Sequence, residues 1–273
     1  MGPDNLKLTD PVLRAMARLR PLTDWSRLEG GASEPQLFAA RGEGPEVVHV
    51  VAKLPDNPQG LRVLANEWLG AKLLDLLGAP HPPVYLLEVP NACVAQAAYT
   101  TGAPLRGGLA FATAYLAAAE VPAPEDLDDL DRPEALARIA LFDTWTGNVD
   151  VRQLRHMRRS GGGPGSQVFA VDQGGCFGGA AWTADELDRA PSPVLDATTP
   201  ALLGHLRDPR EALREALEAL AAADAETLLD LTAAIPEPWG VGASERAALT
   251  RYMLRRREPT ACLYRCGWLA GET

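Results

Sequence analysis

The stretch VVAKLPDNPQGLRVLANEWLGAKLLDLLG, Val50–Gly78, contains two successive patterns that decide the expected fold. Its first residues, with those before them, form an apolar and largely β-branched run that predicts a buried strand over residues 46–54. From residue 58 the apolar side chains recur at intervals of three and four, which predicts a helix that ends at Gly78. Lys53 therefore lies near the end of a buried strand, and Glu67 lies within the helix that follows.

A lysine on a buried strand and a glutamate on the following helix can form an ion pair. A charged side chain in so apolar a strand is costly to bury unless it has a partner. Glu67 supplies that partner if the helix packs against the strand, and a lysine fixed in this way can hold two phosphates of a nucleotide. The spacing leaves a second interpretation open, in which Lys53 marks the point where the strand leaves the core for solvent.

A glycine turn precedes the lysine strand. Residues 25–38 predict a strand, a turn that contains Gly30, Gly31 and Ser33, and a second strand. Glycines at such a turn let backbone amides approach an anion closely, as a loop over phosphates requires. The turn alone is equally typical of an ordinary hairpin, but its place ahead of Lys53 favours the phosphate interpretation.

The remaining patterns divide the chain into a strand-rich part and a helical part. A helix is expected over residues 11–20, and strands over residues 84–89 and 92–98 are expected to form a hairpin. Beyond this point a short strand is expected over residues 167–171 and helices over residues 109–119, 133–145, 183–189, 199–206, 209–223, 225–234 and 244–257. This order predicts an α+β architecture with one unit over residues 1–97 and a second over residues 98–273.

Two acidic residues of the second unit directly follow regular elements. Asp150 ends the sequence GNVD after a predicted helix, where a carboxylate can orient a hydroxyl and accept its proton. An Asx turn at a helix end is the alternative for this stretch. Asp172 interrupts FAVDQGGCFGG at the end of a strand, and a hard oxygen ligand with so little bulk around it suits Mg²⁺ bound to phosphates.

Composition narrows the class of protein. With 47% apolar and 23% charged residues, a chain of 273 residues is expected to fold around a sizeable core. The formal net charge of −10 argues against a protein that binds nucleic acid through its phosphates. No apolar run approaches the roughly 20 residues that a membrane-spanning helix needs, and no signal peptide is recognisable. A cytoplasmic protein without a membrane partner is expected, with its four cysteines as buried free thiols.

One segment is locally basic. Residues 152–159 contain four arginines around His156. Such a cluster can bind an acidic or phosphorylated partner. A solvated loop that leads into the glycine-rich residues 161–165 is the alternative, and the sequence favours it.

Several stretches resemble the HipA-like kinase family of compact bacterial serine/threonine kinase-like proteins. Val50–Val89 is similar to the family's lysine strand and the helix after it, and Leu141–Asp150 is similar to its GNxD catalytic loop. Val168–Gly179 is similar to its metal-binding IDxGxxFGG segment, and IPEPWG, Ile235–Gly240, to its C-terminal IPxxW segment. The similar stretches lie between residues 30 and 257, which is nearly the whole chain.

The resemblance implies a protein-kinase-like fold, with a small β-rich N-lobe and a mainly helical C-lobe on either side of a nucleotide cleft. It implies ATP and Mg²⁺ as cofactors. The implied roles are Lys53 on the α- and β-phosphates with Glu67 as its partner, Asp150 as catalytic base, Asp172 as magnesium ligand, Gly30, Gly31 and Ser33 as the phosphate loop, and Gln96 to Ala98 as the hinge beside the adenine.

The catalytic loop departs from the kinase pattern. Kinases carry an asparagine a few residues after the catalytic aspartate, where it binds a second magnesium ion. Here residues 151–156 read VRQLRH, so Gln153 is the candidate ligand, and its additional methylene moves the amide. The favoured function is an ATP-dependent phosphotransferase that acts on a protein Ser/Thr hydroxyl. The alternatives are a nucleotide-binding pseudokinase that acts through a protein partner, and a kinase of small molecules.

Overall fold

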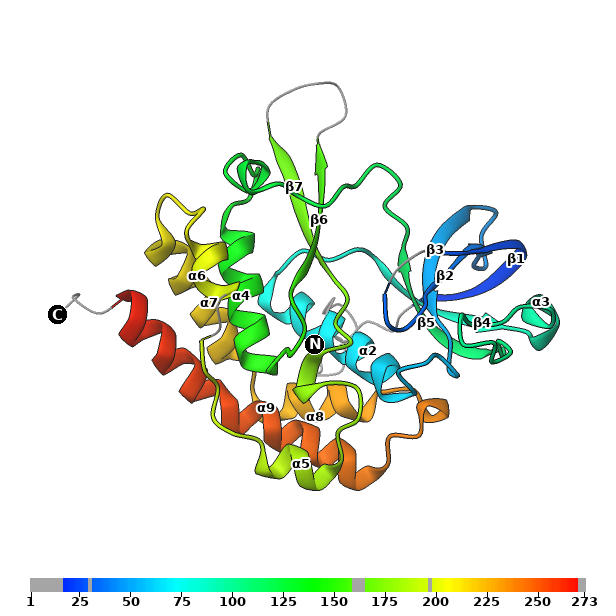
Figure 1. Ribbon diagram of the computed structural model, residues 1–273. Helices are drawn as coiled ribbons and strands as arrows, with labels where there is room; N and C mark the ends of the chain where they lie inside the picture. Colours follow the sequence, from blue (N-terminus) through cyan, green and yellow to red (C-terminus); the bar gives the residue numbers. More distant parts are fainter. Residues whose placement is uncertain (1–16, 29–30, 159–164, 196–197, 270–273) are drawn as a thin grey trace, which may run out of the picture.

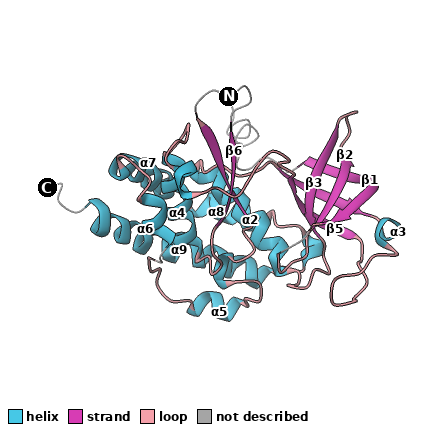
Figure 2. Cartoon of the chain, turned by 45° about the horizontal axis from the view of Figure 1, so that its top comes forward, coloured by secondary structure: helices cyan, strands magenta, loops and turns pink. Residues whose placement is uncertain are grey.

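The computed structural model describes residues 17–28, 31–158, 165–195 and 198–269. The first part of the described chain contains a closed barrel of five strands (Figures 1 and 2). The strands are β1 (Ala17–Arg27), β2 (Gln36–Arg41), β3 (Val47–Lys53), β4 (Val84–Val89) and β5 (Gly108–Ala114). Their order around the barrel is β1-β2-β3-β5-β4, and a parallel pairing of β1 with β4 closes it. The other neighbouring strands are antiparallel.

Small and β-branched side chains fill the barrel. Val50 and Ala52 of β3 pack with Ala110 and Ala112 of β5 in one apolar cluster, and all four are fully buried. Phe111, between the two alanines, belongs to the second cluster, which includes α2 and the helical part. Successive residues of β5 thus face opposite sides, as the geometry of a strand requires.

The helix α2 (Arg62–Leu77) lies between the barrel and the helical part of the chain (Figure 1). Most of its side chains are buried, and it contacts β5 and the helices α4, α7 and α8. It ends at Gly78, whose φ of 64° is a left-handed conformation that glycine adopts without strain. The helix therefore fixes the position of the barrel relative to the second part of the molecule.

The second part is mainly helical and carries one two-stranded hairpin. Its helices are α4 (Glu134–Thr146), α5 (Ala184–Arg189), α6 (Thr198–Leu203), α7 (Pro209–Ala222), α8 (Ala225–Ala233) and α9 (Ala243–Tyr264). The hairpin consists of β6 (Gln153–Arg158) and β7 (Ser166–Val171), and stands between the barrel and the helices (Figure 1). The shorter segments are α3 (Asn91–Val94), the 3₁₀ turns Pro124–Leu127, Cys176–Gly178 and Glu237–Trp239, and the π-helical turn Arg265–Leu269. In the part of the chain that is described, no helix is both long and apolar enough to cross a membrane.

Most expected elements are confirmed. The strand over 46–54 is β3, the helix that ends at Gly78 is α2, and the expected strands over 84–89 and 167–171 are β4 and β7. The helix α2 begins four residues later than expected, because Asn57 folds the preceding residues into a turn through bonds to the carbonyls of Leu54 (2.8 Å) and Gly60 (3.0 Å). The helices expected after residue 130 correspond to α4 to α9.

Two expected elements of the barrel region are wrong. Residues 109–119 were expected to be helical, but residues 108–114 form the strand β5. Both faces of this strand are apolar, so its alternation is invisible in the sequence, and its pairing with β3 and β4 overrides the helix propensity of its alanines. Residues 92–98, expected as a strand, contain the short helix α3 followed by a turn.

Further expectations need correction at the ends of the chain and in the basic segment. Residues 17–20, the end of an expected helix, begin the strand β1, while residues 11–16 lie outside the described residues. The basic residues 153–158, expected as a solvated loop, form the strand β6 with buried Leu154 and His156. Two of the four cysteines, Cys262 and Cys266, are exposed rather than buried.

The barrel also extends beyond the expected first unit. Residue 97 was its expected end, but β5 lies after that residue and pairs with both β3 and β4 in the barrel. A division after residue 97 would remove this strand from its barrel. The same misassignment of β5 as a helix explains the position of the expected boundary.

Candidate functional site

A cavity of about 530 Å³ lies between the barrel and the β6–β7 hairpin. The barrel contributes Val51 and Lys53 from β3, and the hairpin contributes Gln153 and Arg155 from β6. The other lining residues are Leu28, Gly31, Ser33, Pro35, Glu67, Pro82, Phe111, Thr113, Ala114, Tyr115, Leu116, Ala119, Val171 and Asp172. Lys53, Glu67 and Asp172 meet at one end of the cavity, which we call the charged end, and apolar residues that follow β5 line the other end.

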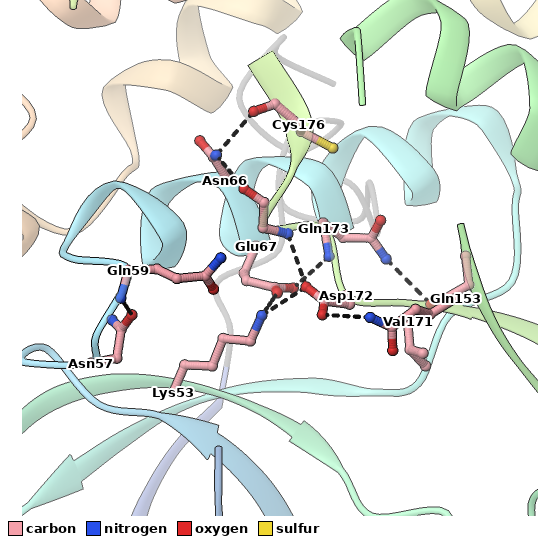
Figure 3. A network of polar contacts seen from close by, with 12 residues as sticks. Lys53, Asn57, Gln59, Asn66, Glu67, Gln153, Val171, Asp172, Gln173 and Cys176 are labelled. Atoms are coloured by element: carbon pink, nitrogen blue, oxygen red, sulfur yellow. Dashed lines mark hydrogen bonds and ion pairs between the residues drawn. The ribbon is translucent and has the colours of Figure 1, made fainter. Parts of the chain in front are cut away.

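Lys53 joins two carboxylates at the charged end (Figure 3). Its Nζ donates a hydrogen bond to Glu67 Oε1 on α2 and lies 2.8 Å from Asp172 Oδ1, just beyond β7. Lys53 is only 8% exposed and Glu67 only 2%, so both charges are held away from water. The structure therefore confirms the expected contact between the strand lysine and the helix glutamate, and excludes the interpretation of Lys53 as a solvent-exposed strand end.

The three charges shift one another's ionisation. Burial disfavours the charged form of Lys53, but Glu67 and Asp172 outweigh it, so the pKa of Lys53 lies above its ordinary value. Burial, reinforced by the like charge of Asp172, raises the pKa of Glu67 despite the lysine beside it. Burial would also raise the pKa of Asp172, but the attraction of Lys53 and the hydrogen bonds it receives lower it. Asp172 therefore remains an anion at neutral pH, beside a lysine that remains a cation.

The backbone at Asp172 is unusual. Its φ of 62° is in the left-handed region, which non-glycine residues rarely adopt. The backbone N–H of Gln173 donates to Glu67 Oε2 at 3.0 Å, and that of Gly174 donates to Asp172 Oδ1 at 3.3 Å. Strained conformations of this kind cost free energy and persist where the surroundings impose them, often at functional sites.

Gln153 also contacts Asp172. Its Nε2 donates to Asp172 Oδ2 at 3.0 Å, while Lys53 Nζ and the Gly174 N–H donate to Asp172 Oδ1, so both carboxylate oxygens have nitrogen partners (Figure 3). Gln153 is the first residue of β6 and pairs with Val171 of β7, which precedes Asp172. Gln153, the candidate for the second metal ligand, therefore lies beside Asp172 in the structure.

The loop of Asp150 packs against the glycines after Asp172. The Val149 N–H donates to the Gly175 carbonyl at 3.0 Å, and the Asp150 N–H donates to Asn148 Oδ1 at 3.2 Å. A Cβ at Gly175 would lie 2.5 Å from Asp150 Oδ2. The two acidic loops therefore touch, and a side chain at residue 175 would displace the carboxylate of Asp150.

A buried ion pair between Arg152 and Asp143 stabilises the loop that carries Asp150. The guanidinium of Arg152 binds both oxygens of Asp143 on α4, with Nε 2.9 Å from Asp143 Oδ2. Its Nη1 donates to the carbonyls of Val171 (2.9 Å) and Asp172 (3.2 Å). Arg152 thus ties α4, the Asp150 loop and the end of β7 into one unit, which is a structural role that the sequence had not assigned.

Comparison with known proteins places these residues in a family. A family model described as HipA-like kinase matches residues 26–163, half of the chain, and this range includes Lys53, Glu67, Asp150 and Gln153. The chain belongs to the HipA-like kinase family. None of the curated proteins matches it significantly.

Two solved structures are similar to this HipA-like kinase in fold. The Helicobacter pylori proinflammatory kinase CtkA has a TM-score of 0.56 and 12% identity, over 91% of this chain and 96% of CtkA. A structure of hydra Fam20 with sugar has a TM-score of 0.54 and 15% identity, over 92% of this chain and 86% of that one. At such low identities the likeness shows the fold alone, which is kinase-like and mixes helices with strands.

The structure brings together most of the expected site residues of this HipA-like kinase. Lys53 contacts Glu67 and Asp172, Asp172 also contacts Gln153, and Asp150 lies on the adjoining loop. In the glycine turn, Gly31 has a φ of 85° and lines the cavity with Ser33. Gly30 lies outside the described residues.

The structure does not bring the expected hinge residues to the cavity. Gln96 and Ala98 do not line the cavity, and Ala98 instead forms an isolated bridge with Pro104. The cavity is lined instead by Ala114, the last residue of β5, and by Tyr115 and Leu116 directly after it. Because residues 109–119 were expected to be a helix, the connection that leaves the barrel was placed one strand too early.

Asn66 is a further important residue that the sequence reasoning missed. It is fully buried, and its Nδ2 donates to the carbonyls of Gly174 (2.7 Å), Cys176 (2.9 Å) and Gly179 (3.0 Å). Its Oδ1 accepts from Trp182 Nε1 at 2.8 Å. Asn66 thereby shapes the glycine loop after Asp172, and an asparagine next to Glu67 on a largely apolar helix was the signal that could have revealed it.

Proposed function

We propose that this HipA-like kinase transfers the terminal phosphoryl group of ATP to a hydroxyl group, with a protein serine or threonine as acceptor. The observation that carries the proposal is the buried contact of Lys53 with Glu67 and Asp172 at the charged end of the cavity. A lysine cation and a metal-binding carboxylate held together in this way are the parts that phosphoryl transfer requires.

The barrel and the helical part then form the two lobes of a nucleotide cleft. We place their division after Ala114 of β5 rather than after residue 97, so that the barrel remains whole. The phosphates lie at the end that contains Gly31, Ser33 and Lys53, and the base lies at the apolar end near Leu116. The glycine turn covers the phosphates, because backbone amides without side chains can approach them closely.

The donor set near Asp172 fits a magnesium ion. Mg²⁺ prefers oxygen ligands and is usually held by one or two carboxylates together with substrate phosphates. Asp172 supplies the carboxylate, and Gln153 supplies an amide oxygen once its amide turns over to present Oε1. When bound, Mg²⁺ neutralises charge on the phosphates of ATP.

The chain's own groups would then act as follows. Lys53, kept cationic by its two acidic neighbours, binds phosphate oxygens, and Glu67 holds its ammonium in place. Asp150 accepts the hydroxyl proton of the acceptor as the acceptor oxygen bonds to the terminal phosphorus, while the bond from this phosphorus to the bridging oxygen breaks and ADP leaves. The packing of Gly175 against Asp150 sets the distance between the base and the metal-binding loop.

The surroundings of Asp150 favour a protein acceptor over a small molecule. Its neighbours Val149 and Val151 are 64% and 85% exposed, so the loop that carries Asp150 is open to solvent. An open apolar face suits an extended polypeptide, whereas a small molecule is usually bound in a concave pocket.

Calorimetric titration with a non-hydrolysable ATP analogue tests the nucleotide site. We expect binding that Mg²⁺ strengthens in the wild-type protein, that Lys53→Ala abolishes, and that loses its dependence on Mg²⁺ in Asp172→Ala. Asp150→Asn should bind the analogue normally and fail to transfer phosphate from ATP. Absence of binding by the wild-type protein would refute the proposal.

A nucleotide-binding pseudokinase that acts through a protein partner is the second candidate. It is favoured by the absence of an asparagine in residues 151–156, where Gln153, with its additional methylene, is the candidate ligand. The two candidates differ in turnover, since a pseudokinase would pass the calorimetric test and show no transfer of labelled phosphate to itself or to any acceptor.

A further inference from the structure

Arg155 is a cation in the cavity to which the proposed chemistry gives no task. Two cationic side chains are among the described residues that line the cavity, Lys53 and Arg155. Lys53 has two carboxylate partners, whereas the Nη1 of Arg155 donates to the carbonyl of Leu154 at 3.0 Å and, among the described residues, Arg155 has no ion pair. A half-buried guanidinium with unused donors and a free face is suited to a ligand.

The strand β6 fixes where Arg155 lies. Side chains two apart on a strand share a face, so Arg155 faces the cavity together with Gln153, about 7 Å further along the strand. Beyond it, His156 exchanges backbone hydrogen bonds of 2.8 and 2.9 Å with Glu120, in the segment that follows β5. Because Gln153 binds Asp172, Arg155 lies away from the charged end, toward the end lined by Leu116 and Ala119.

The barrel provides an apolar surface on the other side of the same cavity. Leu28, after β1, and Val51 of β3 line it from the barrel, and Arg155 and Val171 line it from the hairpin. A flat group that enters this end would lie between aliphatic side chains and a planar guanidinium. Guanidinium groups stack on aromatic faces and attract their π electrons, which an ammonium on a flexible chain does less well.

We propose that Arg155 stacks on the base of the bound nucleotide and so contributes to its affinity without contacting its phosphates. This inference depends on the proposed nucleotide site and adds to it a cation that recognises the aromatic base. Every base has a π face, so the contact favours a nucleoside triphosphate over inorganic tripolyphosphate and discriminates little between ATP and GTP.

Calorimetric titrations with MgATP, MgGTP and magnesium tripolyphosphate test this inference in four proteins: wild type, Arg155→Leu, Arg155→Lys and Arg158→Leu. The first substitution removes the guanidinium, and the second retains a charge without the planar group. Arg158 is the matched control, because it lies on the same strand, is exposed, and pairs with Asp126 outside the cavity. Thermal unfolding of each variant shows whether it is folded.

We expect Arg155→Leu to lower the affinity for both nucleotides about tenfold, and to leave the affinity for tripolyphosphate unchanged. Arg155→Lys should lose most of the same affinity, and Arg158→Leu should behave as wild type. Equal weakening of tripolyphosphate would show a phosphate contact and overturn the inference, as would unchanged nucleotide binding by a folded Arg155→Leu. A wild-type protein that binds no nucleotide would overturn the proposed function as well, so the two failures are distinguishable.

Discussion

At the scale of single residues, the site depends on contacts that leave no room for a side chain. Gly175 has an ordinary φ of −79°, so its backbone does not require glycine. Its surroundings favour glycine, because an added Cβ would lie 2.5 Å from Asp150 Oδ2 and 2.6 Å from Asn148 Oδ1 and would displace these side chains. This glycine therefore serves the close approach of two loops rather than a turn.

Gly175→Ala should separate these loops. We expect a stability loss of about 1–3 kcal/mol from overpacking, and a fall in phosphoryl transfer of about a hundredfold from displacement of Asp150. Urea unfolding and a labelled-phosphate assay measure the two effects. Gly44→Ala is the control, since nothing lies within 4 Å of a Cβ at that position. A Gly175→Ala protein as stable as this control would show that the loops are free to move apart.

Asn66 shows how one buried side chain can define a loop. Its amide nitrogen faces three backbone carbonyls at 2.7–3.0 Å, and its oxygen faces the Trp182 indole. Only a side chain with both donor and acceptor satisfies these partners. Aspartate has nearly the same shape but would place an acceptor against three acceptors.

Asn66→Asp should therefore destabilise the protein by about 3 kcal/mol or more, because a buried charge loses its donors and meets carbonyl oxygens. Chemical unfolding at neutral pH measures the change. Asn91→Asp is a matched control: Asn91 is exposed, and its Oδ1 accepts from the Gly107 N–H at 2.8 Å, a bond that a carboxylate retains. If both substitutions cost the same, the contacts of Asn66 do not hold the glycine loop.

At the scale of elements, α2 is packed against the glycine loop after Asp172 more closely than most side chains permit. Gly70 lies in the middle of α2, where alanine would ordinarily stabilise a helix by about 1 kcal/mol. A Cβ there would lie 2.7 Å from the Cβ of Gln173 and 3.0 Å from its Cγ. The rigid root of the Gln173 side chain, not its flexible end, occupies the space.

Gly70→Ala should consequently destabilise the protein by about 1–3 kcal/mol, opposite in sign to the helix propensity. The double variant Gly70→Ala/Gln173→Gly removes the colliding atoms, and we expect it to be more stable than the sum of its single variants predicts. A double-mutant cycle of unfolding free energies measures this coupling. Additive single effects would mean that α2 and the loop do not press on each other.

The sequence predicts elements well where one pattern prevails. The strand that contains Lys53 and the helix that contains Glu67 are predicted because their apolar residues recur with clear periods, and Asp150 and Asp172 follow regular elements. The strand β5 is missed because Ala110 faces the barrel and Phe111 the other cluster, so both faces are apolar. The expected hinge residues lie away from the cavity for the same reason. The place of Arg155 in the cavity could not be predicted, because it depends on the pairing of β6 with β7.

At the scale of the whole molecule, the IPEPWG segment connects the barrel, α2 and the C-terminal helix. Trp239 is fully buried, and its Nε1 donates to the Leu109 carbonyl of β5 at 2.8 Å. Arg62, at the start of α2, donates to the carbonyls of Trp239 (3.3 Å) and Gly240 (3.2 Å) and pairs with Glu245 of α9. A segment far along the chain thus fixes the strand that leads to the apolar end of the cavity.

Trp239→Phe tests this connection. Phenylalanine keeps an aromatic ring but cannot donate, so the Leu109 carbonyl loses its indole donor, and we expect a stability loss of about 1–3 kcal/mol. Leu109 lies two residues before Phe111, which lines the cavity, so nucleotide affinity should fall as well. Unfolding by urea and calorimetric titration with MgATP measure the two effects. Trp268→Phe, in the C-terminal π-helical turn, is the control, because that tryptophan is only partly buried and is not the one that bonds to Leu109. We expect this control to change neither the stability nor the affinity for MgATP. Loss of stability with unchanged affinity would place Trp239 in the packing of the helical part alone, and loss of both would show that the C-terminal segment sets the position of the barrel over the cavity.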